Sequence, residues 1–78
     1  MIIVGKDNYI VIDSKHFCTY TIVDYETSAG IVALNAMTEA KTLLGEYPNM
    51  EAAKSALGQL SMALSDDSLE IYYMGAVI

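Results

Sequence analysis

The stretch that decides the fold is LGEYPNMEAAKSALGQLSMAL, residues 44–64. It begins like the end of an apolar strand, turns at Tyr47-Pro48-Asn49, and continues as an amphipathic helix. Asn49 suits the position before the helix, because its side-chain oxygen can accept a hydrogen bond from an amide of the first turn. The apolar residues that follow are spaced by four, three and four positions: Ala53, Leu57, Leu60 and Leu64. This spacing predicts a helix over residues 50–64 with one side facing a core.

Short strands are predicted on both sides of this helix. Residues 2–4 and 9–12 are apolar segments separated by the turn-forming Gly5-Lys6-Asp7-Asn8, which is typical of a hairpin. Residues 18–22 alternate between apolar and polar and are rich in β-branched side chains, as in a half-buried strand. Residues 69–74 alternate in the same way after the helix, which predicts a final strand.

Residues 31–44 fit two patterns. One stripe of a helix would be formed by Ala33, Met37, Ala40 and Leu44, and alanine favours that state. Against a helix, Ile31 and Val32 are β-branched, and the polar residues 38–41 fall where a tight turn would separate two strands. We therefore expect strands here, with a helix as the alternative. The predicted fold class is then α+β: an antiparallel β-meander of about five to six strands packed by one helix, in a single domain.

The composition is rich in apolar residues for so short a chain. Hydrophobic residues make up 54% of the 78 positions, and a core built from so few residues is marginal. The segment Gly75-Ala76-Val77-Ile78 would also leave apolar side chains exposed after the last strand. We therefore expect self-association, most simply a homodimer. No apolar run is long enough to span a bilayer and no signal-peptide pattern opens the chain, so we expect a cytoplasmic location.

The charge balance is acidic. Ten acidic residues against four lysines and no arginine give a net charge of −6. This balance argues against direct binding to nucleic acid through its phosphates and against binding to anionic membranes. Cys18 is the only cysteine, which excludes an intramolecular disulfide and any multi-cysteine metal site and fits a reducing compartment.

The second half of the chain resembles a family of small uncharacterised proteins carried by phages and prophages of Gram-positive bacteria. The resemblance rests on Leu44-Gly45-Glu46-Tyr47 at a strand end, on the capped helix that begins MEAAKSAL at residues 50–57, and on Ile71-Tyr72-Tyr73-Met74. Asn49 stands where that family has serine or threonine, and it can cap equally well. The first half matches by pattern only. The resemblance implies a mobile-element origin and a β-meander through residues 31–44, and it supplies no catalytic residue.

Two groups of residues are candidates for chemistry. His16 and Cys18 could serve as base and nucleophile, but on one strand their Cα atoms would lie roughly 7 Å apart, and a rim histidine beside a small buried thiol is the favoured interpretation. Oxygen ligands for a divalent cation could come from Asp66, Asp67 and Glu70. No glycine-centred calcium loop surrounds them, which favours a solvated helix end. We therefore expect no enzyme activity, no metal and no cofactor.

Tyrosines and carboxylates are the candidate binding residues. Tyrosine rings bury apolar area while their hydroxyls form hydrogen bonds, and they are enriched at interfaces. Spaced carboxylates can present the charge of nucleic-acid phosphates to a basic groove. The alternatives are tyrosines that line the edge of the core and acids that maintain solubility. The predicted binding residues are Tyr20, Tyr25, Glu26, Glu39, Glu46 and Tyr72.

Three functions remain open on these grounds. The leading hypothesis is a small phage-encoded binding protein in the host cytoplasm that inhibits an antiphage defence system, for example by blocking the basic groove of a nuclease as anti-CRISPR proteins do. The second is an oligomeric sponge that sequesters a nucleotide signal, with tyrosines stacking on the base. The third is a structural or accessory phage protein, which needs no site.

Overall fold

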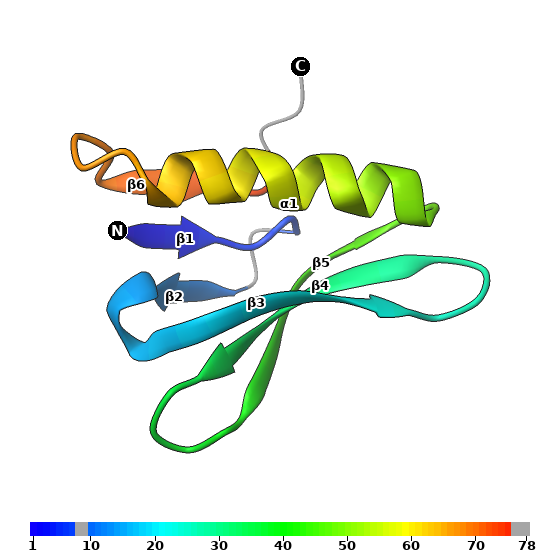
Figure 1. Cartoon of the computed structure of the whole chain (residues 1–78), viewed down its shortest axis with the longest axis horizontal. Coiled ribbons are helices and arrows are strands. Elements are labelled where there is room, and N and C mark those ends of the chain that lie inside the picture. The colour runs from blue at the N-terminus through cyan, green and yellow to red at the C-terminus, as the bar shows by residue number, and fades with distance from the viewer. Residues whose placement is uncertain (8–9, 76–78) are drawn as a thin grey trace.

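The computed structural model describes residues 1–7 and 10–75, in which six strands and one α-helix follow one another (Figure 1). In chain order the elements are β1 (Ile2–Val4), β2 (Val11–Asp13), the short 3-10 helix η1 (Ser14–His16), β3 (Phe17–Asp24), β4 (Ala29–Asn35), β5 (Lys41–Tyr47), α1 (Met50–Leu64) and β6 (Ile71–Tyr73). The α+β class and the helix over residues 50–64 are confirmed. The expected start of the second strand at Tyr9, and residues 76–78 of the expected apolar tail, lie outside the described residues.

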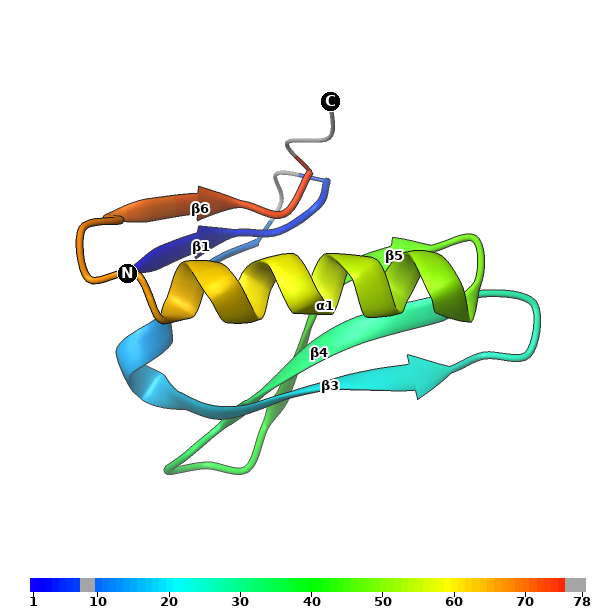
Figure 2. The same ribbon diagram turned by 45° about the horizontal axis from the view of Figure 1, so that its top comes forward.

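The strands form two three-stranded sheets. One is the antiparallel meander β3-β4-β5, and the other has the order β2-β1-β6. In the second sheet β2 is antiparallel to β1, whereas β6 is parallel to it. Two parallel strands need a long crossover between them, and here the whole chain from β2 to the end of α1 supplies it. The sequence pattern predicted one antiparallel meander of about five to six strands. The meander instead has three strands, and the other three form a separate sheet whose last strand is parallel to β1 (Figure 2).

Residues 31–35 lie in strand β4 and residues 41–44 in strand β5, so the strand prediction is confirmed and the helical alternative is wrong. The turn between them is fixed by Asn35, whose Oδ1 accepts hydrogen bonds from the amides of Met37 (2.8 Å) and Thr38 (3.0 Å). Glu39 completes the turn with a left-handed backbone, φ 60°. Asparagine favours turns because its side chain can bond the backbone two residues on, and this local signal outweighs the helical spacing of the alanines.

A β-bulge at Leu44 joins the two sheets. Ile31 pairs with Gly45 while Val32 pairs with Leu43, so Leu44 is an extra residue on β5. Its carbonyl oxygen accepts a hydrogen bond from the Lys6 amide, at 2.6 Å, just past the end of β1. Because of the extra residue, the alternation of faces is reset along β5. Leu44 and Tyr47 are both buried, and the residues before each of them, Leu43 and Glu46, are both exposed.

The core lies between α1 and the inner faces of both sheets. The Asn49 cap is confirmed, since its Oδ1 accepts a hydrogen bond from the Ala52 amide at 2.8 Å. Ala53 and Leu60 of the predicted stripe are fully buried, and Leu57 and Leu64 pack against the core at partial burial. The buried cluster comprises Ile3, Ile12, Ala29, Ile31, Ala33, Leu44, Tyr47, Ala53, Leu60 and Met74. In the described part of the chain, no helix is long and apolar enough to cross a membrane.

Candidate functional site

The meander β3-β4-β5 has one face that α1 leaves uncovered. Strand pairing sets Thr21, Val32 and Leu43 side by side in one row of this face. The next row contains Gly30 on β4, flanked by Val23 and Glu46. Side chains on one face of a sheet alternate with those on the other, so this row structure follows from the register.

Tyr25 and Leu43 meet above Gly30. A Cβ atom placed on Gly30 would lie 2.9 Å from Tyr25 Cε2 and 2.9 Å from Leu43 Cδ1, which is closer than such atoms approach one another. Glycine at this strand position therefore makes room for both side chains, and the aromatic ring covers the backbone that glycine leaves bare. Tyr25 remains 44% exposed and Leu43 43% exposed. Both side chains therefore lie over Gly30, and both keep an exposed part that a partner could reach.

A tight turn fixes the position of Tyr25. Its amide donates to the Ser28 carbonyl oxygen at 2.9 Å, and the Glu26 amide donates to Asp24 Oδ1 at 2.8 Å. Glu26 adopts a left-handed backbone, φ 75°. This conformation costs a non-glycine residue roughly 1 kcal/mol, which the hydrogen bonds of the turn offset.

Three carboxylates belong to this turn or are bonded to it. Asp24 and Glu26 flank it in the turn, and Glu46 Oε2 accepts a hydrogen bond from Ser28 Oγ at 2.7 Å, which ties the end of β5 to the same turn. Lys6, the nearest lysine along this strand end, donates through Nζ to the Glu46 carbonyl oxygen and stands 4.5 Å from the centre of the Tyr47 ring. We call this region the Tyr25 surface and define it by Asp24, Tyr25, Glu26, Gly30, Leu43 and Glu46.

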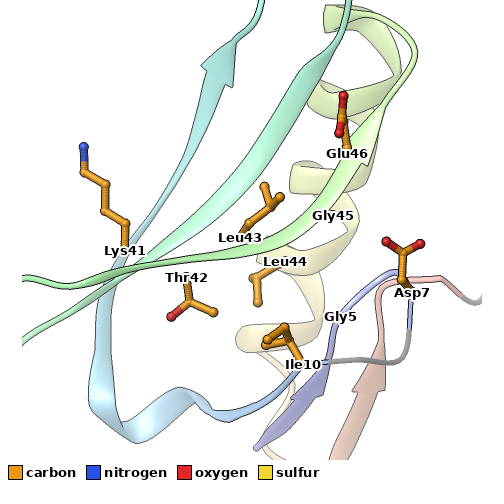
Figure 3. Close-up of a pocket in the computed structure, with 9 residues that line it drawn as sticks. All are labelled: Gly5, Asp7, Ile10, Lys41, Thr42, Leu43, Leu44, Gly45 and Glu46. Carbon is orange, nitrogen blue, oxygen red and sulfur yellow. The ribbon is translucent and has the colours of Figure 1, made fainter.

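A groove of about 500 Å³ lies along β5, which has β4 on one side only in its sheet (Figure 3). It is lined by Gly5, Asp7, Ile10, Lys41, Thr42, Leu43, Leu44, Gly45 and Glu46. The Lys41 ammonium stands at one end and the carboxylates of Asp7 and Glu46 stand at the other (Figure 3). The two carboxylates make this end of the groove unfavourable for a phosphate group.

The structure brings together three of the six predicted binding residues. Tyr25, Glu26 and Glu46 lie on the Tyr25 surface. Tyr20 and Tyr72 instead point to the side covered by the helix and are half-buried, while Glu39 lies in the turn at the opposite end of the meander. The reason is alternation: Tyr20 shares a strand face with Ile22, which packs on the core, and Tyr72 is central in β6 with its neighbours pointing outward. Burial raises the pKa of both tyrosine hydroxyls.

Gly30 and Leu43 belong to the site and were not predicted for it. Gly30 lies inside β4, and no described glycine has a positive φ. A glycine within an otherwise strand-like run is a signal of close approach by another group, and that signal was present in the AGIVAL segment at residues 29–34. The neighbours that approach it depend on strand register, which the local sequence does not show.

The candidate catalytic and metal-ligating residues have local roles. Cys18 is exposed at an irregularity of β3, so the expected burial of its thiol is wrong, and its Sγ lies 3.8 Å from the Leu34 carbonyl oxygen. Asp66 accepts hydrogen bonds from the hydroxyl (2.6 Å) and the amide (3.0 Å) of Ser68, which lower the pKa of its carboxyl group. Among residues 1–7 and 10–75, no three His, Cys, Asp or Glu side chains are grouped so that they could hold a metal ion.

No protein-family model, curated protein or solved structure matches the chain in the comparisons made with them. The resemblance to phage and prophage proteins therefore stays a prediction.

Proposed function

We propose that the chain is a non-catalytic binding protein that covers a basic surface of another protein, with the Tyr25 surface as its contact. One observation carries the proposal: an exposed tyrosine lies over Gly30 beside Leu43, in a turn that contains Asp24 and Glu26 and is hydrogen-bonded to Glu46 through Ser28. Rigid aromatic anchors of this kind supply much of the energy of protein interfaces. Carboxylates around such an anchor favour a partner rich in lysine and arginine and speed its encounter with that partner.

The concrete form of the proposal is an inhibitor of a bacterial antiphage defence system, encoded by a phage and acting in the host cytoplasm. Its partner would be a nuclease or a guide-bound complex whose groove normally holds nucleic-acid phosphates. The net charge of −6 and the grouping of Asp24, Glu26 and Glu46 support such a replacement, because spaced carboxylates present negative charge as a phosphate backbone does. The resemblance to phage proteins supports the setting.

The nucleotide sponge has less support. The groove beside β5 contains a single lysine, Lys41, among its lining residues, and it also contains Asp7 and Glu46. A nucleotide in that groove would bring its phosphates close to carboxylates, which is unfavourable where water is partly excluded. An accessory phage protein without any site is the outcome that remains if no partner binds the Tyr25 surface.

The test is affinity capture of purified defence nucleases by the tagged chain, followed by competition with duplex DNA. We expect capture by the unmodified protein, displacement by DNA, and loss of capture with Tyr25→Ala and with Glu46→Gln. Glu39→Gln is the matched control, because it removes the same charge from the opposite end of the meander. Binding should weaken steeply with salt. Equal capture by Glu46→Gln and the unmodified chain, or binding insensitive to salt, would contradict the proposal.

A thermal-shift series with cyclic nucleotides tests the sponge in the same preparation. A ligand that binds only the folded state raises the melting temperature by mass action. Stabilisation by a nucleotide would replace our proposal with the sponge, and no shift would be consistent with the inhibitor.

A further inference from the structure

The small sheet β2-β1-β6 has an outer face made almost entirely of apolar side chains. Inward-pointing residues of these strands, Ile3, Ile12 and Tyr72, belong to the core or pack against it. The alternate residues therefore point outward. Register places Val4 between Val11 and Tyr73 in one row, and Ile2 between Asp13 and Ile71 in the other. We call the outward side chains of Ile2, Val4, Val11, Ile71 and Tyr73 the β1 face.

The exposure of this face is high for aliphatic and aromatic side chains. Val11 is 62% exposed, Tyr73 51% and Ile71 47%, while Ile2 and Val4 between them are half-buried. The only charged side chain in the two rows is Asp13 at one corner, where its Oδ1 lies 4.0 Å from the N-terminal ammonium group. Contiguous apolar patches of this size are often functional, which makes this face a candidate interaction site.

We propose that a second copy of this chain covers the β1 face, in a two-fold symmetric dimer in which two β2-β1-β6 sheets stack face to face. The argument for this occupant is charge. Two copies with a net charge of −6 repel each other, so they can associate only through a face with few carboxylates. The two rows of the β1 face hold one carboxylate, at a corner beside an ammonium group, whereas the Tyr25 surface holds three. A strongly charged partner, in contrast, would find almost nothing to pair with on the β1 face.

The size of the face predicts the strength of the dimer. Its exposed side chains present on the order of 400 Å² per copy, within the range of the largest apolar patch on an ordinary monomer. Stacking two such faces buries roughly 800–1,000 Å², somewhat below the area of stable complexes. The dimer is therefore in exchange with the monomer at micromolar concentrations.

Sedimentation equilibrium across a wide range of protein concentration tests the proposal. We expect a monomer–dimer equilibrium, with Val11→Lys and Tyr73→Lys each raising the dissociation constant roughly tenfold or more, because symmetry buries the new charge twice. Met62→Lys and Met37→Lys are matched controls, since these methionines are 75% and 88% exposed but lie in α1 and in the β4–β5 turn. The controls should leave the dimer unchanged. Thermal melting of each variant at low concentration verifies its fold.

Three results would overturn the proposal. The first is a monomer at every concentration, and the second is a dimer equally weakened by the control variants. The third is a dimer that Tyr73→Lys weakens and Val11→Lys does not. Because Val11 lies on β2 and Tyr73 on β6, on opposite sides of β1, that result would mean that the copies pair through the edge of β6 and not through the β1 face. Salt separates this inference from the proposed function. Added salt should tighten the dimer by screening repulsion between like-charged copies, whereas it should weaken binding to a basic partner.

Discussion

Replacing Tyr47 with phenylalanine should stabilise the protein. The Tyr47 side chain is 7% exposed, and its buried hydroxyl has no hydrogen-bond partner among the described residues. A buried polar group without a partner costs about 1–3 kcal/mol relative to its hydrated state, and phenylalanine removes that cost while keeping the ring. In the variant, the Lys6 ammonium, which lies 4.5 Å from the centre of the Tyr47 ring, would still face an aromatic ring and would still donate its hydrogen bond to the Glu46 carbonyl oxygen. We expect Tyr47→Phe to raise the free energy of unfolding by about 1 kcal/mol.

The assay is denaturant unfolding followed by far-ultraviolet circular dichroism, at a protein concentration low enough to keep the chain monomeric. A gain of 1 kcal/mol corresponds to a melting temperature higher by about 4–8 °C in a domain of this size. Tyr25→Phe is the control, because that ring is 44% exposed and its hydroxyl can stay hydrated. It should change stability by no more than about 0.5 kcal/mol. If Tyr47→Phe lost stability by 1 kcal/mol, the hydroxyl would be bonded in solution and our reasoning refuted.

The pH dependence of the same variant gives an independent check. Burial raises the pKa of Tyr47 above its ordinary value of 10.0. A raised pKa means that the folded state favours the neutral hydroxyl. The contribution of this group to the free energy of unfolding is therefore fully present below pH 10.0, and it is lost as the pH rises through the pKa of Tyr47 in the folded protein. Tyr47→Phe should therefore lose less stability at alkaline pH than the unmodified chain, and its absorbance titration should lack one late-ionising tyrosine.

Three further predictions concern single positions. Asn49→Ala should lower the free energy of unfolding by about 1 kcal/mol through loss of the helix cap, whereas Asn49→Asp should preserve it, as measured by urea titration. Gly58→Ala should raise the free energy of unfolding by about 1 kcal/mol, because nothing lies within 4 Å of the new methyl group. Gly45→Ala should lower it by roughly 1–3 kcal/mol, because the new Cβ would lie 2.8 Å from Lys6 Cβ, just past the end of β1; thermal melting that shifted both variants in the same direction would contradict this pair of predictions. Hydrogen bonds lower the pKa of Asp13 and Asp66 below 3.8, so the contribution of these carboxylates to stability is present above that pH and is lost as the pH falls through their pKa values in the folded protein. Asp66→Asn should therefore reduce the loss of stability on acidification, and an unchanged dependence of stability on acid pH would contradict this.

The elements that could be predicted from the sequence are those whose signals are local. The helix over residues 50–64 follows from the Asn49 cap and the four-three-four spacing, and both lie within the segment they describe. The turn after Asn35 is local as well, since a side chain bonds amides two and three residues on. Such signals do not depend on which other strands are present, so the helix and the turn form where the local sequence predicts them.

The features that could not be predicted depend on residues far apart in the chain. No local pattern shows that β6 pairs with β1, or that an extra residue at Leu44 joins the two sheets. For the site, the approach of Glu46 to the turn that contains Tyr25 depends on the register of β4 against β5. Tyr20 was misplaced on the binding surface because a strand's alternation gives two faces without saying which one the helix covers.

The parallel pairing of β6 with β1 also constrains how the protein folds. Strand β1 acquires its second neighbour only after β3, β4, β5, α1 and β6 have been made, so the sheet β2-β1-β6 is completed by a contact between distant parts of the chain. Contacts between distant parts of a chain form slowly, because the entropy of closing the intervening loop is lost before the contacts stabilise the chain. We therefore expect the hairpins of the meander and the helix to form early and the small sheet to close last. Until it closes, one edge of β1 lacks its partner strand, and that edge is where a slowly folding or truncated chain would begin to aggregate.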